Sequence, residues 1–176
     1  MAEGPGAKDS DELLQQASPS KSGSTLAEQK DELMNRIREV FNVGRIHRSD
    51  SSCGGYSHNA GTVSGVLIAI EGGSDEHAKD VCMHVAAMRP AALSAEQLDQ
   101  AEIEKERQIL REAALREGKP EKIVDKMVEG RIGNYIAERC LLAQAFVKDD
   151  KLTVGKFAEQ NGMKVNDFIH WELGAE

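Results

Sequence analysis

Two groups of side chains contain the residue types from which catalytic or metal sites are built. The first is Cys53, which lies beside two glycines and five residues before His58. A thiol needs a neighbouring proton acceptor to become a reactive thiolate, so Cys53 and His58 could be drawn as a cysteine nucleophile with its base. A loop cysteine beside glycine is ordinarily incidental, and that is the interpretation we favour.

The second group is a pair of histidines with a cysteine between them. His77 and His84 are seven residues apart, which places both on one face of a helix, with Cys82 nearby. Imidazole and thiolate groups bind zinc, but the spacing supplies no fourth ligand, so we favour two partly exposed histidines near the two ends of the helix. No phosphate-binding glycine loop, HExxH helix or GxSxG elbow occurs in the sequence. The sequence therefore predicts no catalytic residue, no metal and no cofactor.

The composition narrows the class of partner. The 176 residues include 30 acidic and 22 basic side chains, which give a net charge of −8. Tight binding to a phosphate backbone depends on a surplus of basic charge, so no nucleic-acid partner is predicted. Three cysteines without a CxxC pair favour a reducing compartment. No apolar run approaches the ~20 residues that span a bilayer, and no signal peptide is recognisable, so we expect a cytoplasmic protein without a membrane partner.

The first fifty residues divide into two segments. Residues 1–24 contain few apolar side chains, which favours a disordered tail or linker with at most one short helical turn. Thr25 and Glu28 form the capping-box pattern of a helix start. Apolar residues at spacings of three and four then predict a helix that ends near 42–44, followed by a weakly alternating strand at 43–49.

A strand and a helix that share a core are predicted next. The β-branched and apolar run at 63–70 indicates a buried strand, with 56–58 as its hairpin mate after a flexible turn at 49–55. Ser74 can cap the following helix, which the ArgPro pair at 89–90 stops. The predicted inner stripe of this helix consists of Ala78, Val81, Cys82, Val85 and Met88.

The segment from about 101 to 142 indicates two long helices. Apolar residues recur at helical spacing on both sides of Gly118 and Pro120, which supply an end and a fresh start. So short a turn requires the helices to run antiparallel. Charge runs at 102–107 and 111–118 are interpreted as the solvated side of a helix, with ion pairs four residues apart. A protruding hairpin buries less surface than a compact bundle, which favours contact with a partner.

The remaining residues predict a short helix at 153–161 and a strand at 164–173. One face of this strand would carry Val165, Asp167, Ile169 and Trp171, and the other Phe168. The strand must pair with an early one, because the other strand candidates precede residue 72. The predicted fold class is therefore α+β, with a small, mostly antiparallel sheet packed with helices and a protruding antiparallel helical hairpin.

A set of short segments stands out by its order along the chain: KDVCMHVAAMRP (79–90), EGKP (117–120), KMVEGR (126–131), QAFVKD (144–149), TVGKF (153–157) and FIHWELG (168–174). They resemble successive segments of the elongation factor Ts family, and the resemblance runs from Asp31 to the end. It implies a guanine-nucleotide exchange factor of translation. Such a protein binds the GTPase elongation factor Tu and promotes release of GDP by docking, without covalent catalysis.

The resemblance also implies a domain organisation. Residues 25–50 would be the remainder of a first core subdomain, and residues 51–176 the second core subdomain with a coiled-coil hairpin. Two family features have no counterpart in the sequence: the amino-terminal three-helix domain and the TDFV-type motif that intrudes near the nucleotide. The NDFI segment at 166–169 matches a different part of the family. Met1 would then begin a shortened gene product. The alternative function is a docking or dimerisation fragment, a homodimer included, that binds elongation factor Tu without efficient exchange.

Partner-binding residues follow from the resemblance, position by position. His84 matches a histidine that contacts the third domain of elongation factor Tu. Ser64 and Gly65 match an IleGly contact pair of the family. Gly65 agrees with the family pattern, whereas Ser64 departs from it and removes the apolar contact of the isoleucine. The hairpin tip matches the region that reaches the nucleotide-binding domain of the partner. Its predicted binding residues are Glu117, Gly118, Lys119 and Lys122.

Overall fold

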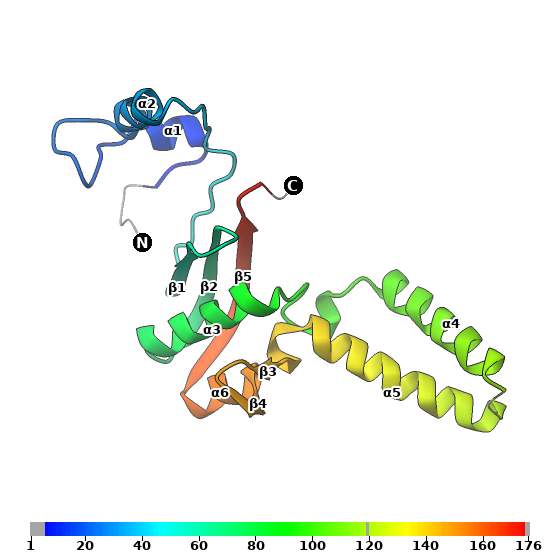
Figure 1. Cartoon of the computed structure of the whole chain (residues 1–176). Helices are drawn as coiled ribbons and strands as arrows, with labels where there is room; N and C mark the ends of the chain where they lie inside the picture. The colour runs from blue at the N-terminus through cyan, green and yellow to red at the C-terminus, as the bar shows by residue number, and fades with distance from the viewer. Residues whose placement is uncertain (1–5, 119, 175–176) are drawn as a thin grey trace. The chain divides into compact units, whose positions relative to one another are not determined.

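The computed structural model describes residues 6–118 and 120–174. The chain forms two compact units, Met1–Asp50 and Ser51–Glu176, and each is described by itself. Helices occur together with a three-stranded and a two-stranded sheet, both antiparallel (Figure 1). This confirms the predicted α+β class. Among the described residues, no helix is both long enough and apolar enough to cross a membrane.

The first unit contains the helices α1 (Ser10–Leu14) and α2 (Leu26–Ile37). Thr25 and Glu28 form the capping box as predicted, each side chain accepting from the other residue's backbone amide. The helix ends earlier than predicted, because Arg38 adopts the left-handed conformation with a φ of 60°. The strand predicted at 43–49 is wrong, since no strand occurs among the described residues of this unit. A strand there would have no neighbour to complete its hydrogen bonds.

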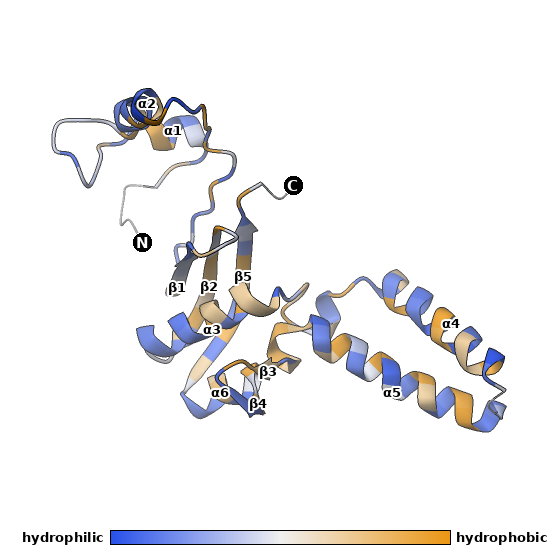
Figure 2. Cartoon of the chain, viewed as in Figure 1, coloured by the Kyte–Doolittle hydropathy of each residue, from blue (hydrophilic) through white to orange (hydrophobic). Residues whose placement is uncertain are grey.

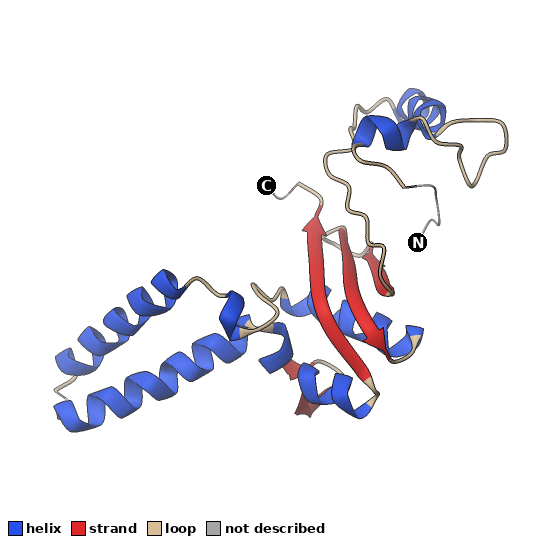
Figure 3. Cartoon of the chain, turned by 180° about the vertical axis from the view of Figure 1, so that it is seen from behind, coloured by secondary structure: helices blue, strands red, loops and turns tan. Residues whose placement is uncertain are grey.

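The second unit is built around a three-stranded sheet in the order β1-β2-β5. Its strands are β1 (Cys53–His58), β2 (Ser64–Gly72) and β5 (Met163–Glu172), and both pairings are antiparallel. The predicted pairing of the last strand with an early one is thus confirmed. Helix α3 (Asp75–Met88) covers one face of the sheet, and Figure 3 shows the other face, where no helix of the described part of this unit lies.

Strand β1 begins at Cys53, within the segment that the sequence predicts to be a flexible turn. The glycines that suggested a turn have a packing role here. A β-carbon on Gly54 would lie 2.6 Å from the β-carbon of Ala78 on α3, closer than atoms can approach. Gly54 therefore allows the helix to lie close against the strand, as glycine does where backbones approach closely.

Strand β5 carries a β-bulge that changes which residues face the core. Its pairing with β2 shifts between Val165 and Asp167, so Asn166 is an inserted residue. Val165 is buried in the core, and Phe168 packs against the same core. The prediction that Val165 shares a face with Asp167 and the following odd-numbered residues, with Phe168 opposite, is therefore wrong.

The core of this unit lies between the sheet and α3. Helix α3 is capped by Ser74 and stopped at Arg89, as predicted, and its inner stripe is buried with one exception. Met88 is 47% exposed, because it lies in the last turn of the helix beyond the core. The fully buried side chains of the core include Ile68, Val81, Cys82, Val85, Leu141, Phe146 and Val154.

Helices α4 (Gln100–Arg116) and α5 (Glu121–Arg139) pack along one another through a thin apolar seam. The seam consists of Ile103, Ala114, Val124, Val128 and Ile132. Arg107 pairs with Glu129 and Arg111 with Asp125, so residue numbers rise along one helix as they fall along the other. The helices therefore run antiparallel, and hydrophobic and hydrophilic residues alternate along both (Figure 2). These two ion pairs bridge the helices. Within α4, Arg116 pairs with Glu112 four residues earlier, which confirms a predicted pair within a helix. The role of this pair as a protruding coiled coil stays a prediction.

Short elements connect these helices to the sheet. They are the 3-10 turns η1 (Ala95–Gln97) and η2 (Leu141–Ala143), the strands β3 (Ala145–Phe146) and β4 (Asp149–Thr153), and helix α6 (Val154–Gln160). Helix α6 is confirmed and is capped by Thr153. The β3–β4 pair is too short to leave a periodic signal in the sequence.

Candidate partner-docking site

The first predicted contact lies at the start of β2, where Ser64 and Gly65 point to opposite sides of the sheet. Ser64 is buried and lies in register with His58 and Glu172. Gly65 is exposed, and a β-carbon added to it would meet no atom within 4 Å. Of this pair, Gly65 thus offers bare, accessible backbone to a partner, whereas Ser64 belongs to the side of the sheet that α3 covers.

The second predicted contact, His84, is fully buried on α3, with an exposed fraction of 0%. Its Nε2 atom lies 2.9 Å from Oε1 of Gln144, and its Nδ1 atom accepts from the backbone N–H of Val147 at 3.2 Å. Burial lowers the pKa of the imidazole, and the bond to Gln144 acts in the opposite direction. His84 is therefore neutral at physiological pH, and it is not the partly exposed histidine that the sequence suggested.

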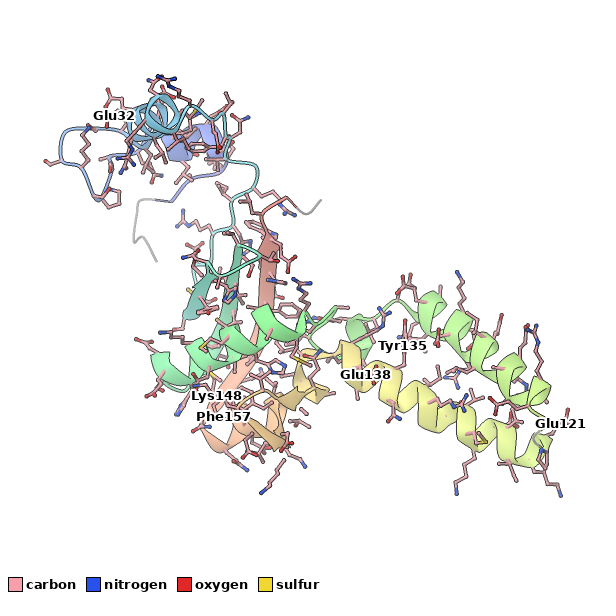
Figure 4. All side chains as sticks on the ribbon, in the orientation of Figure 1. Glu32, Glu121, Tyr135, Glu138, Lys148 and Phe157 are labelled. Atoms are coloured by element: carbon pink, nitrogen blue, oxygen red, sulfur yellow. The ribbon has the colours of Figure 1, made fainter. Side chains whose placement is uncertain are left out.

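The third predicted contact is the turn between α4 and α5. Glu117, Gly118 and Lys122 are exposed, and Lys119 lies outside the described residues. Gly118 has a φ of 73°, a left-handed conformation that glycine adopts without strain and that ends α4. Figure 4 places Glu121, the first residue of α5, at the far end of the helix pair. Exposed charged groups therefore surround a tight turn.

These three positions do not form one pocket. Helix α5 has 19 residues, which correspond to about 28 Å at a rise of ~1.5 Å per residue, and the turn lies at its far end. Figure 4 shows Tyr135 and Glu138 at the opposite end of α5, where the helix meets the rest of the unit. Gly65 lies on the sheet and His84 inside the core. The geometry suits contacts with a large partner at separate points, and not enclosure of a small substrate.

The alternative cysteine nucleophile is not assembled. Cys53 and His58 lie at the two ends of β1, about 16 Å apart at ~3.3 Å per residue, and an odd separation points their side chains to opposite faces. The hydroxyl of Tyr56 lies 3.0 Å from Nδ1 of His58. A base that far from the sulfur cannot take its proton.

The proposed metal ligands are also kept apart by their surroundings. His77 packs edge-on against Phe157, with ring centroids 5.7 Å apart, while His84 is engaged with Gln144. Burial raises the pKa of Cys82 to about 12, which disfavours the thiolate form of this side chain. Among the described residues, no three potential ligands are grouped closely enough to hold an ion.

Sequence reasoning missed Gln144, the buried partner of His84. It is 3% exposed, and its Nε2 atom donates to the backbone oxygen of Glu138 at 2.7 Å. The only signal for it in the sequence is its place at the start of the QAFVKD segment, which resembles a segment of the family but points to no chemistry. A lone glutamine in a sequence does not reveal a buried hydrogen-bond partner 60 residues away.

Comparison with known proteins agrees with the resemblance of the short segments. The model of the family described as "Elongation factor TS" matches residues 5–175. Elongation factor Ts of Thioalkalivibrio sulfidiphilus (strain HL-EbGR7) is 42% identical over 156 residues, which cover 86% of this chain and 53% of the relative. The chain thus spans about half the length of that curated relative. A match that extends over nearly every residue, at this level of identity, shows that the chain belongs to the elongation factor Ts family.

Proposed function

We propose that this chain binds elongation factor Tu in the cytoplasm and promotes release of GDP from it. The single observation that carries the proposal is the family match over residues 5–175. Residues 25–50 would serve as the remainder of a first core subdomain and residues 51–176 as the second core subdomain. The docking residues would be those at the separate positions described above.

Nucleotide exchange of this kind needs no nucleophile. If the chain binds the empty GTPase more tightly than the GDP-bound form, linkage requires that GDP binds more weakly when the chain is present. The factor by which the chain prefers the empty GTPase equals the factor by which it weakens GDP binding. Exchange therefore depends on docking surfaces, which this chain has at Gly65 and at the turn between α4 and α5.

The docking surfaces differ in what they offer. At Gly65 the open backbone favours close approach of an apolar or flat partner surface, because no side chain intervenes. At the turn, Glu117 and Lys122 offer charged groups that steer and orient a partner. Direct contact through His84 would require the side chains that bury it to move first, since its exposed fraction is 0%.

The proposal is tested by titrating the chain into nucleotide-free and GDP-bound elongation factor Tu. We expect tighter binding to the empty form, and weaker binding for Gly65→Val and for Lys122→Glu, each by on the order of tenfold. Gly44→Val is the matched control, because a β-carbon at Gly44 also meets no atom within 4 Å. Equal affinity for the two forms of the GTPase, or no effect of either docking variant, would refute the assignment.

A second candidate is a docking or dimerisation module without efficient exchange. The face of the sheet opposite α3 carries the partly exposed side chains of Leu67, Ile169 and Trp171. Another protein surface could pack against this apolar row. A second copy of the chain is one such surface. Sedimentation at increasing concentration distinguishes a homodimer from a monomer, and a chain that binds the GTPase without accelerating GDP release would favour this candidate.

A further inference from the structure

The helix pair α4–α5 meets the rest of its unit at a buried polar junction. His84 of α3, Gln144 after η2 and the backbone of Glu138 in the last turn of α5 form a continuous chain of hydrogen bonds. The backbone N–H of Val147, after β3, adds a further bond to the imidazole. One histidine thus connects the helix that covers the sheet to the end of the helix pair.

The direction of donation along this chain is fixed. The N–H of Val147 can only donate, so Nδ1 of His84 is the acceptor and the ring proton lies on Nε2. Nε2 then donates to Oε1 of Gln144, and the amide nitrogen of Gln144 donates to the oxygen of Glu138. Carbonyls in the last turn of a helix have no partner within the helix, so Gln144 satisfies one that would otherwise be unpaired.

Backbone bonds hold the two ends of the helix pair to each other at the same place. The N–H groups of Ala91 and Ala92 both donate to the oxygen of Arg139, at 2.8 and 3.3 Å. In return, Leu141 donates to Ala92 and Leu142 to Leu93, at 2.8 and 3.1 Å. The segment that leads into α4 and the segment that leaves α5 therefore lie side by side where they join the core.

Burial makes the geometry of this junction specific. His84 and Gln144 are enclosed among Phe146 and other core side chains, so each polar atom must find a partner of the right type and direction. The apolar seam of α4 and α5 and the core around α3 are separate clusters. Apolar packing alone therefore does not determine the direction in which the helix pair leaves the core.

We propose that His84 and Gln144 are positioning residues that set the direction of the α4–α5 pair, and that they thereby couple docking at Gly65 to docking at the turn. This inference rests on the function proposed above. When two contacts are held on one rigid body, the second forms as an intramolecular step at high effective concentration. A loosened junction lowers that effective concentration, so the turn contributes less to binding.

The first test measures the direction of the helix pair without any partner. Spin labels are attached at Ile109→Cys on α4 and Lys164→Cys on β5, both exposed, in a Cys53→Ser background that leaves only buried cysteines. We expect one narrow distance distribution in this background. Adding Gln144→Met, which keeps the volume but removes the hydrogen bonds, should broaden it or shift it. His84→Gln is a second variant with the same expectation, for use if Gln144→Met does not fold. An unchanged distribution in a folded variant overturns the inference.

The second test is a double-mutant cycle on binding to nucleotide-free elongation factor Tu. In the wild-type background, Lys122→Glu is expected to weaken binding on the order of tenfold, and in the Gln144→Met background by about twofold. Lys151→Glu, an exposed lysine on β4, is the charge-matched control. An equal effect of Lys122→Glu in both backgrounds contradicts the coupling. If the distance distribution broadens but Lys122→Glu has no effect anywhere, the positioning role holds and the docking proposal fails.

Discussion

The body of the second unit and its helix pair are stabilised in different ways. In the body, β2, α3 and β5 bring together residues that are far apart in the sequence, and the side chains between them are fully buried. In the helix pair, a seam of five buried residues joins two consecutive helices, and exposed ion pairs flank it. The body thus depends on long-range packing, and the helix pair on local packing and surface charge.

This difference predicts different modes of unfolding. Long-range contacts are lost together, so the body should unfold as one cooperative element. The helix pair buries little apolar surface and can open locally while the body stays folded. A docking element that opens locally can adapt its shape to a partner, whereas the body of the unit keeps one folded structure.

The largest effect is expected from truncation in the body. Ile68 is fully buried between the sheet and α3, and Ile68→Ala should lower the free energy of unfolding by about 2–5 kcal/mol. Urea denaturation followed by circular dichroism measures the loss as a shift of one cooperative transition. A loss below about 1 kcal/mol would mean that the body is not tightly packed around Ile68.

Truncation in the seam of the helix pair should have a smaller and more local effect. Val128 is buried in the seam, and Val128→Ala should cost about 1–2 kcal/mol. Hydrogen exchange should accelerate at amides of α4 and α5 and stay unchanged at amides of β2 and α3. Equal acceleration in both regions would show that the two regions unfold as one element.

The junction between the two regions should make stability depend on pH. Burial lowers the pKa of His84 in the folded chain, while the unfolded imidazole has a pKa of about 6.5. Between these pKa values the unfolded chain holds a proton that the folded chain lacks, so the free energy of unfolding rises with pH. The stability that His84 contributes is fully present above about pH 6.5 and is lost as the pH falls through the pKa of the folded chain.

His84→Gln removes this titrating group. Urea denaturation of both proteins between about pH 5 and 8 should show a weaker pH dependence in the variant. A difference between the two proteins that is constant over this range would contradict the assigned neutral state of His84.

The smallest effect is expected from the surface ion pairs of the helix pair. Arg111 and Asp125 are about half exposed, so Arg111→Gln should cost about 0–1 kcal/mol. The cost should be largest at low salt and fall at high salt, because salt screens exposed charges. Hydrogen exchange of amides in α5 at two salt concentrations measures this cost. Arg116→Gln is the control, because the partner of Arg116 lies on its own helix.

Much of the fold could be predicted from the sequence because periodicity and caps are local signals. Ser74 and Thr153 each begin a helix as predicted, and the antiparallel arrangement of α4 and α5 follows from their short connection. The bulge at Asn166 could not be predicted, because it depends on the partner strand. The end of α2 was missed for a similar reason: Val40 continues the helical pattern but is 82% exposed, so nothing holds it in a helix.

The site was predicted only in part, since resemblance supplies positions but not their surroundings. Ser64 alternates with Val66 and Ile68, a period of two that already places it on the buried face, so this part of the geometry was present in the sequence. The burial of His84 was not, because it depends on Gln144 and Val147, which approach from a distant segment. Long-range hydrogen bonds leave no local pattern.

The most direct test of the proposed function is the rate at which fluorescent GDP leaves elongation factor Tu when this chain is added. We expect the rate to rise with the concentration of the chain and to saturate on the order of tenfold or more above the spontaneous rate. Lys122→Glu should need a higher concentration for the same acceleration. A release rate that stays at the spontaneous value while the chain is bound would contradict exchange activity and leave docking alone.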